Sequence, residues 1–454
     1  MSTTSRSANV STLSPEASPA SGNAAQSAAL KARDTREGHA TTRIGGFLAL
    51  AAQLAALLLV FHLYHLETPA FILMSAAAFG AFLVHYWLPF RFKELFWVGV
   101  SMVGAFWIVE PRVAVMLIAI GLAFFLILRS PVPFWSRVVA VSAIFGVLIY
   151  SCATARLHIP LAFYPIFGAI FMFRIIVYIY DLAHAKEPAR LLPFLSYFYI
   201  LPNFYFVLFP VIDFQTMRTT YYRRDIHDTA QEGIHWMARG AVQLMLYRLV
   251  VYFNDPYLPD RVNSLGAVIA TVVLTFLLYL HVSGTFHFIV GMLHLFGYDL
   301  PETHRRWLLA HSFLDFWRRI NIYWKDFMVK IVYFPVYFRL RKRGELNAQI
   351  SATVCVFLAT WILHSYQLFW VEGRFELTWP DTIFWGTLGI LVIVNVLYDH
   401  WHPRRKKNSS LKARAINAAQ ILGTFAVITT LWSLWSTATV SGWIYLVTHW
   451  AQHS

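Results

Sequence analysis

Two polar side chains in apolar surroundings could do chemistry in this sequence, and the first is His364. It lies inside Ile350–Trp370, an apolar segment long enough to cross a bilayer as a helix. At helical spacing, one face of that segment carries Thr353, Thr360, His364 and Gln367. An ionisable residue within a membrane span is a candidate functional residue, because placing it there is costly. The alternative is structural: an imidazole that hydrogen-bonds to a neighbouring helix and holds the bundle together.

The second is Asn321, within His311–Pro335, a stretch that reads HSFLDFWRRINIYWKDFMVKIVYFP. This stretch is too charged to cross a bilayer and too apolar for a free loop. Its periodicity predicts one amphipathic helix, lying at the membrane surface or partly sunk among other helices. The apolar side of that helix comprises Phe313, Trp317, Ile320, Trp324, Phe327 and Ile331, and the other side carries Asp315, Arg318, Arg319, Lys325 and Asp326. Asn321 falls at the edge of the apolar side, where a buried amide needs a hydrogen-bond partner or has a function.

A histidine and an asparagine are enough for acyl transfer from a thioester to a hydroxyl. The reaction needs a base for the hydroxyl, donors for the carbonyl oxygen as charge develops on it, and exclusion of water. His364 suits the base and Asn321 can donate its amide. The sequence contains no Gly-x-Ser-x-Gly elbow, Walker loop or dinucleotide fingerprint.

The composition predicts the elements that must position these residues. The chain is 58% hydrophobic and 13% charged, too apolar for a soluble protein of 454 residues. We therefore expect an all-α polytopic membrane protein. The net charge of +14 fits cytoplasmic loops between spans, and no motif for binding nucleic acid accompanies it. The two cysteines, Cys152 and Cys355, form neither a disulfide framework nor a metal set.

The order of apolar segments predicts the organisation of the chain. Residues 1–42 are expected to be a disordered cytoplasmic tail, and residues 43–454 a membrane domain. Leu191–Pro210, interrupted by prolines, is predicted to be a re-entrant hairpin, with a cap on the soluble side as the alternative. The long segment Ser264–Phe296 is predicted to tilt in the membrane or to bend near Gly284 and Gly291. The expected spans are 44–64, 70–89, 95–109, 112–128, 137–153, 161–180, 231–253, 264–296, 350–370, 383–398, 413–435 and 440–450.

Lys and Arg alternate between the loops in a way that predicts orientation. Clusters at Arg43, Arg91/Lys93, Arg129/Arg137 and Lys186/Arg190 mark one side, and the intervening loops carry few positive charges. By the positive-inside rule the N-terminus is cytoplasmic. Arg305–Arg343, with ten Lys or Arg, is expected at the same side. We expect the protein in the cell inner (plasma) membrane, in contact with membrane lipids.

The charged stretch also resembles a family signature. DFWRRINIYWKDFMVKIVY is similar to the signature of the membrane-bound O-acyltransferases (MBOAT), closest to the bacterial branch of alginate O-acetylation and teichoic acid D-alanylation. The resemblance covers about 194–388. The matching positions are Asp315, Phe316, Trp317, Arg318, Arg319, Trp324, Asp326, Val332, Tyr333 and Pro335, with His364 at the family's catalytic histidine. The departures are Ile320 for Trp, Asn321 for His, His287 for Asp, and Leu363 and Ser365 beside the histidine.

The resemblance implies an MBOAT-like bundle of about 11–12 transmembrane helices with re-entrant and interfacial segments. It implies an O-acyltransferase that moves an acetyl or other short acyl group to a hydroxyl of an exported glycan, glycolipid or lipid. The donor would be acyl-CoA or an acyl carrier protein thioester, with no bound cofactor or metal. A partner acyltransferase on the outer side is a further implied partner. The catalytic residues would be His364 and Asn321, with a substrate tunnel lined by Asp315, Trp317, Arg318, Arg319, Trp324, His287 and Gln367.

Two other functions remain open at this point. A transporter or flippase for a lipid-linked glycan would also need a polar path through the membrane, with His364 as a gate. A degenerate MBOAT protein that only scaffolds an assembly is the other alternative, favoured by the departures from the signature. An enzyme requires Asn321 and His364 to line one cavity, whereas a transporter has no special need for that pairing.

Overall fold

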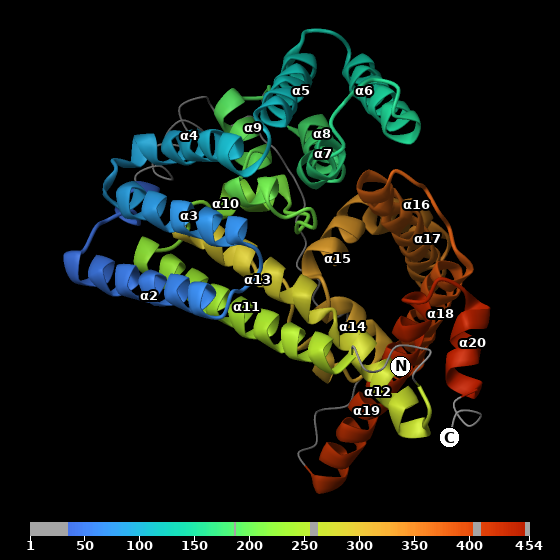
Figure 1. The fold of residues 1–454 in the computed structure, drawn as a ribbon. Coiled ribbons are helices and arrows are strands. Elements are labelled where there is room, and N and C mark those ends of the chain that lie inside the picture. The colour runs from blue at the N-terminus through green and yellow to red at the C-terminus, as the bar shows by residue number, and fades with distance from the viewer. Residues whose placement is uncertain (1–34, 186–187, 255–261, 403–409, 450–454) are drawn as a thin grey trace, which may run out of the picture.

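The computed structural model describes residues 35–185, 188–254, 262–402 and 410–449, and within these ranges it contains helices and no strand (Figure 1). The first helices are α2 (Ile44–Leu63), α3 (Pro69–Trp87), α4 (Phe90–Ile108), α5 (Pro111–Arg129), α6 (Phe134–Thr154), α7 (Phe163–Phe171), α8 (Arg174–His184), α9 (Leu191–Phe198), η1 (Leu201–Phe204), α10 (Phe214–Thr220) and α11 (Ile226–Asn254). The others are α12 (Leu265–Leu277), α13 (Leu280–Leu295), η4 (Trp307–Leu309), α14 (Phe313–Arg319), α15 (Ile322–Met328), η5 (Val329–Tyr333), α16 (Phe334–Leu340), η6 (Arg341–Arg343), α17 (Glu345–Glu372), α18 (Trp379–Trp401), α19 (Leu411–Trp435) and α20 (Val440–Thr448).

Nine apolar stretches of the described chain are long enough to cross a membrane. This confirms an all-α polytopic membrane protein, with fewer candidate spans than the 11–12 expected. The expected spans at α4, α11 and α20 do not qualify, because α4 and α11 carry several charged side chains and α20 has 9 residues. The candidate spans are Ile44–Leu63, Pro69–Trp87, Pro111–Arg129, Phe134–Thr154, Phe163–His184, Leu265–Leu295, Glu345–Glu372, Trp379–Trp401 and Leu411–Trp435.

The expected N-terminal tail falls mostly outside the described residues, which begin at Thr35. Its last part, 35–42, is described and contacts the bundle. The backbone N–H of Ile226 donates to the carbonyl oxygen of His39 at 2.9 Å, and the His39 ring bonds to the Tyr222 carbonyl oxygen at 3.0 Å. The expectation of disorder is therefore wrong for this end of the tail, because its polar groups have partners in the fold.

The helices begin where the sequence provides caps. Ser312 Oγ accepts from the Asp315 N–H at 3.1 Å to begin α14. Thr378 and Asp381 form a reciprocal capping box at the start of α18. Proline stands in the first turn of α3, α5 and α18, where its missing N–H costs nothing.

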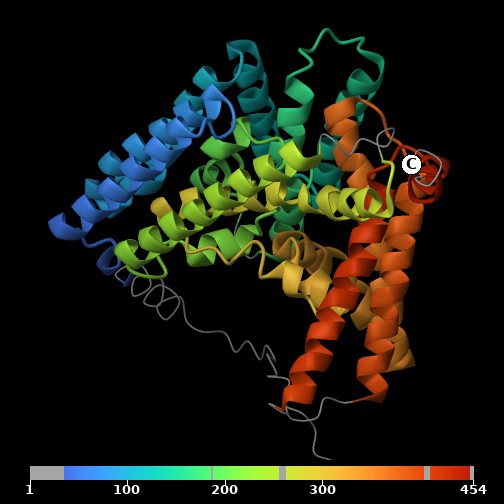
Figure 2. The ribbon, with the colours of Figure 1, turned by 60° about the horizontal axis from the view of Figure 1, so that its bottom comes forward.

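Two groups of long helices determine where the short helices α14 and α15 lie. In the first, α2 packs on α3 and α11, and α11 packs along α13 (Figure 1). In the second, α17, α18 and α19 lie together, and α12 contacts α19 (Figure 2). The short helices α14 and α15 lie between the two groups. Residues on facing elements of both groups can therefore approach one another at α14 and α15.

The helix of segment Ser264–Phe296 is interrupted at Leu278 and Tyr279, between α12 and α13, whereas α13 runs through Gly284 and Gly291 without a break. The glycines are close-contact points instead. A Cβ at Gly291 would lie 2.5 Å from the Gly233 carbonyl oxygen, and a Cβ at Gly240 would lie 2.6 Å from the Gly284 carbonyl oxygen. Two glycines on each helix thus let the backbones of α11 and α13 approach more closely than side chains would allow.

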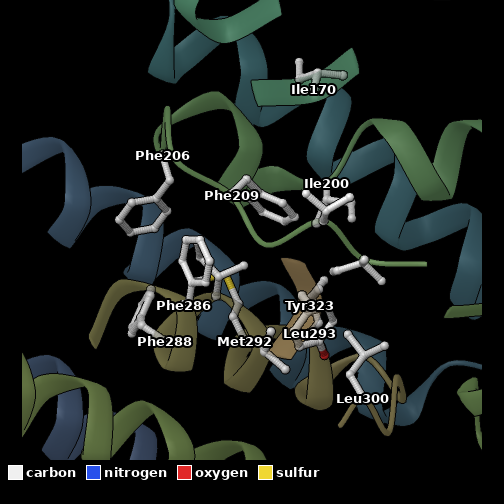
Figure 3. Packing of buried hydrophobic residues seen from close by; sticks show 14 of the residues in the cluster. Ile170, Ile200, Phe206, Phe209, Phe286, Phe288, Met292, Leu293, Leu300 and Tyr323 are labelled. Atoms are coloured by element: carbon white, nitrogen blue, oxygen red, sulfur yellow. The ribbon is translucent and has the colours of Figure 1, made fainter. Parts of the chain in front are cut away.

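The proline-interrupted segment after α9 packs inside the molecule. Leu201, Pro202 and Asn203 are buried in the turn η1. Figure 3 shows Phe206 of this segment facing α13, and its ring centroid lies 6.2 Å from that of Phe288. Helix α9 has only 8 residues, so this region forms no spanning helix. Irregular backbone in such a protein is tolerated where other protein segments cover it.

The prediction of one helix over His311–Pro335 is wrong. The helix ends after Arg319, and a new one starts at Ile322. Asn321 lies between them with φ of 39°, in the left-handed region where asparagine is among the few side chains tolerated. Residues 329–333 then form a π-helical turn before α16. The two helices on either side fit the helical periodicity, but Asn321, with its left-handed backbone conformation, turns the chain between them.

Candidate functional site

A central cavity of about 280 Å³ lies where the two helix groups meet. Five of the predicted site residues line it: His364, Asn321, Trp317, Trp324 and Gln367. The remaining lining residues are Leu208, Tyr279, Val282, Phe286, Phe316, Ile320, Lys325, Leu368, Val371, Phe384, Trp385, Leu388, Trp432 and Trp435. Most of this wall is apolar and aromatic, with a few polar groups that converge on it, which is usual for a small-molecule site.

Asn321 reaches the cavity because of the turn between α14 and α15. Its side-chain Oδ1 accepts a hydrogen bond from the Trp324 N–H at 3.2 Å, which caps α15. The amide oxygen is thus occupied by the backbone. The amide Nδ2 remains the group that Asn321 can offer to a molecule in the cavity.

The turn is held by a neighbouring segment, 301–305. The Ile322 N–H donates to the Thr303 carbonyl oxygen at 2.9 Å, and the Arg305 N–H donates to the Arg319 carbonyl oxygen at 3.0 Å. The Tyr323 hydroxyl donates to the Pro301 carbonyl oxygen at 2.8 Å. These three bonds fix the direction of α15, and with it the position of Asn321.

His364 is held by aromatic rings. Its ring is stacked on Trp385 with centroids 4.7 Å apart, and it meets the edge of Trp435 at 5.7 Å. The Trp324 ring lies 5.3 Å away. No hydrogen bond joins the imidazole to another described side chain or backbone group, so both ring nitrogens remain for a molecule in the cavity.

Trp435 connects the His364 wall to a carboxylate. Its indole N–H donates to Asp381 Oδ1 at 2.5 Å, while the other Asp381 oxygen accepts from Thr378 in the capping box. The first turn of α18 therefore fixes the ring that lies against the histidine. This pair adds a negative charge near one end of the cavity wall.

A second, larger pocket of about 510 Å³ adjoins the cavity, and Trp317 and Lys325 border both. Arg318, Gln349 and His400 line this adjacent pocket. The predicted tunnel residue Arg318 therefore lies on a neighbouring space, with basic side chains, and not on the central cavity.

Besides Arg318, three other predicted tunnel residues do not line the cavity. Asp315 and Arg319 pair with each other at 2.7 Å along α14. His287 is fully buried in α13, where its Nδ1–H donates to the Ser283 carbonyl oxygen at 2.7 Å.

Several lining residues were missed from the sequence, among them Tyr279, Trp385, Trp432 and Trp435. The last two lie beyond the region of resemblance, in α19. Tyr279 stands at the break between α12 and α13, which periodicity did not locate. The available signal was the concentration of tryptophan near the C-terminal end of α19, a feature without a specific chemical meaning.

His304 lies directly behind the cavity wall and is 1% exposed. Burial, together with the nearby charges of His287 and Arg239, holds the pKa of His304 well below its usual range. The imidazole is therefore neutral near pH 7, with one protonated nitrogen.

Among the described residues, no group of three or more His, Cys, Asp or Glu is placed to hold a metal ion. The arrangement instead offers a histidine and an amide on the wall of a largely apolar cavity. A comparison of the chain with protein-family models found no match, and no curated protein matches it either.

Proposed function

We propose that this chain is a membrane-embedded O-acyltransferase with His364 as the general base and Asn321 as a hydrogen-bond donor to the acyl carbonyl. The observation that carries the proposal is that His364 of α17 and Asn321, in the turn between α14 and α15, border one cavity. The resemblance of Asp315–Tyr333 to the MBOAT signature supports the same reaction class. If His364 only joined neighbouring helices, there would be no reason for the Asn321 amide to border the same cavity.

The reaction follows from the groups in the cavity. The acceptor hydroxyl oxygen attacks the thioester carbonyl carbon while His364 takes the hydroxyl proton. The Asn321 Nδ2–H stabilises the carbonyl oxygen as negative charge develops. The C–S bond then breaks, and the imidazolium returns its proton to the leaving thiolate. The apolar wall excludes bulk water, which would otherwise compete with the acceptor.

The sizes and charges of the two pockets support the substrate classes. A cavity of about 280 Å³ is at the lower end for small-molecule sites, which favours an acetyl or other short acyl group. The adjacent pocket carries Arg318 and Lys325, which suit the phosphates of acyl-CoA or of an acyl carrier protein's prosthetic group. The acceptor is a hydroxyl of an exported glycan, glycolipid or lipid, delivered from the outer side, where a partner acyltransferase would receive or extend the product.

Acyl transfer by the purified protein in lipid nanodiscs tests the proposal. Thiol release and product formation are measured with acetyl-CoA and with acylated carrier protein, beside melting temperature. We expect His364→Ala to lower the transfer rate about 10²–10⁴-fold with little change in melting temperature. His184→Ala, at an exposed position on α8, is the matched control and should transfer normally.

Near-normal transfer by His364→Ala would contradict the proposed mechanism. If that variant is unfolded, His364→Gln retains most of the side-chain volume and is measured instead. Parallel loss of folding and transfer in both variants would mean that the histidine only joins helices, and would favour a transporter or a scaffold.

A further inference from the structure

Tyr279 lines the central cavity at the break between α12 and α13. Its ring is fixed between two tryptophans, edge-on to Trp307 at 5.3 Å and to Trp432 at 5.2 Å between centroids. Trp432 also borders the cavity. The orientation of the phenol is thus determined by packing, independently of any bound molecule.

The Tyr279 hydroxyl begins a chain of hydrogen bonds that leads away from the cavity. It lies 2.9 Å from His304 Nε2, and His304 Nδ1 lies 3.1 Å from Thr303 Oγ1. Both Thr303 and His304 are buried, with exposed fractions of 0% and 1%. Because the imidazole is neutral, only one of its nitrogens carries a proton. In one tautomer the hydrogen bonds donate from Tyr279 through His304 to Thr303, and in the other they donate from Thr303 through His304 to Tyr279.

Counting donors and acceptors distinguishes the two directions. If Nδ1 carried the proton, it would donate to Thr303 Oγ1, and the buried Thr303 hydroxyl proton would have no acceptor among the described residues. A buried donor without a partner costs about 1–3 kcal/mol. If Nε2 carries the proton, Thr303 donates to Nδ1 and Nε2–H donates to the Tyr279 oxygen. Each buried proton then has an acceptor, and the phenol proton is left for the cavity.

The same segment also fixes Asn321. The Thr303 carbonyl oxygen accepts from the Ile322 N–H at 2.9 Å, directly after Asn321. The side chain of Thr303 therefore orients one polar group toward the cavity through His304, and its backbone holds the turn that carries the other. The positions of both proposed donors, Tyr279 and Asn321, therefore depend on Thr303.

We propose that Tyr279 is a second hydrogen-bond donor to the acyl carbonyl oxygen, and that His304 and Thr303 are positioning residues that direct its proton into the cavity. This inference rests on the proposed acyltransferase function. The Tyr279 proton stays on the phenol throughout: the hydrogen bond shortens as the carbonyl oxygen gains negative charge and relaxes when the C–S bond has broken.

Tyr279→Phe removes the hydroxyl and keeps the ring between the tryptophans. We expect kcat for acyl transfer to fall about 10–10³-fold, with little change in KM, because the donor acts mainly on the developing charge. Tyr205→Phe is the matched control: it also removes a phenol that bonds to a side chain, Thr68 Oγ1 at 2.9 Å, but it lies outside the cavity. That control should keep wild-type kcat.

Variants of His304 separate positioning from packing. His304→Gln can place an amide N–H where Nε2–H stood, whereas His304→Leu cannot donate. We expect His304→Gln to retain several-fold more of kcat than His304→Leu at comparable melting temperatures. Equal kcat in these two variants would mean that His304 only fills space.

The direction of the hydrogen bonds from Thr303 through His304 to Tyr279 can be measured separately. The ¹⁵N spectrum of histidine-labelled protein, with the His304 signal assigned by its loss in His304→Gln, reports which nitrogen carries the proton. A proton on Nε2 supports the inference and a proton on Nδ1 overturns it. Wild-type kcat in Tyr279→Phe, while His364→Ala is inactive, would overturn this inference alone. A wild-type protein that transfers no acyl group from either donor would overturn the proposed function and the role of Tyr279 with it.

Discussion

The indole N–H of Trp324 donates to Thr360 Oγ1 at 3.4 Å, one helical turn before His364 on α17. The same indole lies 5.3 Å from the His364 ring. Trp324 is also the residue whose backbone N–H is capped by Asn321. One tryptophan therefore couples the turn that carries Asn321 to the helix that carries His364, so the relative position of the two proposed catalytic groups depends on this contact.

Substitutions at Asn321 should separate its backbone role from its amide. Asn321→Ala loses the cap, at about 1 kcal/mol, and places alanine at a positive φ, at about 1–2 kcal/mol more. Asn321→Gly accepts that φ and loses only the side chain. We expect near-normal melting temperature for the glycine variant and a lower one for the alanine variant.

Acyl transfer should fall in both Asn321 variants, about 10²–10³-fold as for loss of one carbonyl donor. A glycine variant that is stable and fully active would show that Asn321 is needed only to form the turn. Melting temperature and single-turnover transfer, measured on the same preparations, give both answers.

The close approach of α11 and α13 should make Gly291 intolerant of any side chain. Gly291→Ala would place a Cβ 2.5 Å from the Gly233 carbonyl oxygen, so the helices would have to separate. We expect a loss of about 1–3 kcal/mol in the free energy of unfolding, typical of overpacking.

Gly386→Ala is the control for this prediction, because an added Cβ there meets nothing within 4 Å. It should leave stability unchanged or slightly raised, since alanine favours helix. Equal melting temperatures of the two variants would contradict the close contact between α11 and α13.

Asp299 should make stability depend on pH in the acid range. It is 3% exposed and accepts from Arg223 at 2.6 Å and from Arg224 at 2.5 Å. Burial alone would raise the pKa of this carboxyl, but the hydrogen bonds from Arg224 and Arg223 outweigh burial and hold that pKa below its usual range. The pKa of Asp299 is thus lower in the folded protein than in the unfolded chain, where it is about 3.9. The ion pairs of Asp299 therefore stabilise the fold above the unfolded pKa, and this stabilisation is lost as the pH falls through the folded pKa.

Comparison of wild type with Asp299→Asn measures this contribution. At pH 7 we expect the free energy of unfolding of the variant to be about 1–3 kcal/mol lower than that of the wild type, and its melting temperature to be lower too. This difference in stability should shrink below about pH 4. Asp228→Asn, at an exposed position of α11, should show no such difference. A gap between wild type and Asp299→Asn that persists unchanged to pH 3 would argue against the ion pairs.

The positive-inside pattern predicts the orientation of α17. Arg341, Lys342 and Arg343 precede this helix, and the exposed residue Glu376 follows it. In a protein with Cys152 and Cys355 replaced, Arg343→Cys should react with a membrane-impermeant reagent from the cytoplasmic side only. Glu376→Cys should react from the outer side. Labelling in the opposite sense would invert the proposed entry sides of donor and acceptor.

The sequence by itself determined the class of protein and much of its helical framework. Hydropathy is a sum over neighbouring residues, so it located α17 and α18, and it showed that His364 lies within a span. The sequence also predicts that no continuous helix forms over Leu191–Pro210, because each proline interrupts a helix at its own position.

Only the tertiary structure decided the turn at Asn321 and the composition of the cavity. A helical period averages over several residues, and it cannot show that one of them adopts φ of 39° when hydrogen bonds from 301–305 hold it there. The cavity wall combines residues as distant in sequence as Leu208, Tyr279 and Trp435. Their proximity depends on how α12, α18 and α19 pack, and packing between distant segments leaves no periodic trace in the sequence of any one of them.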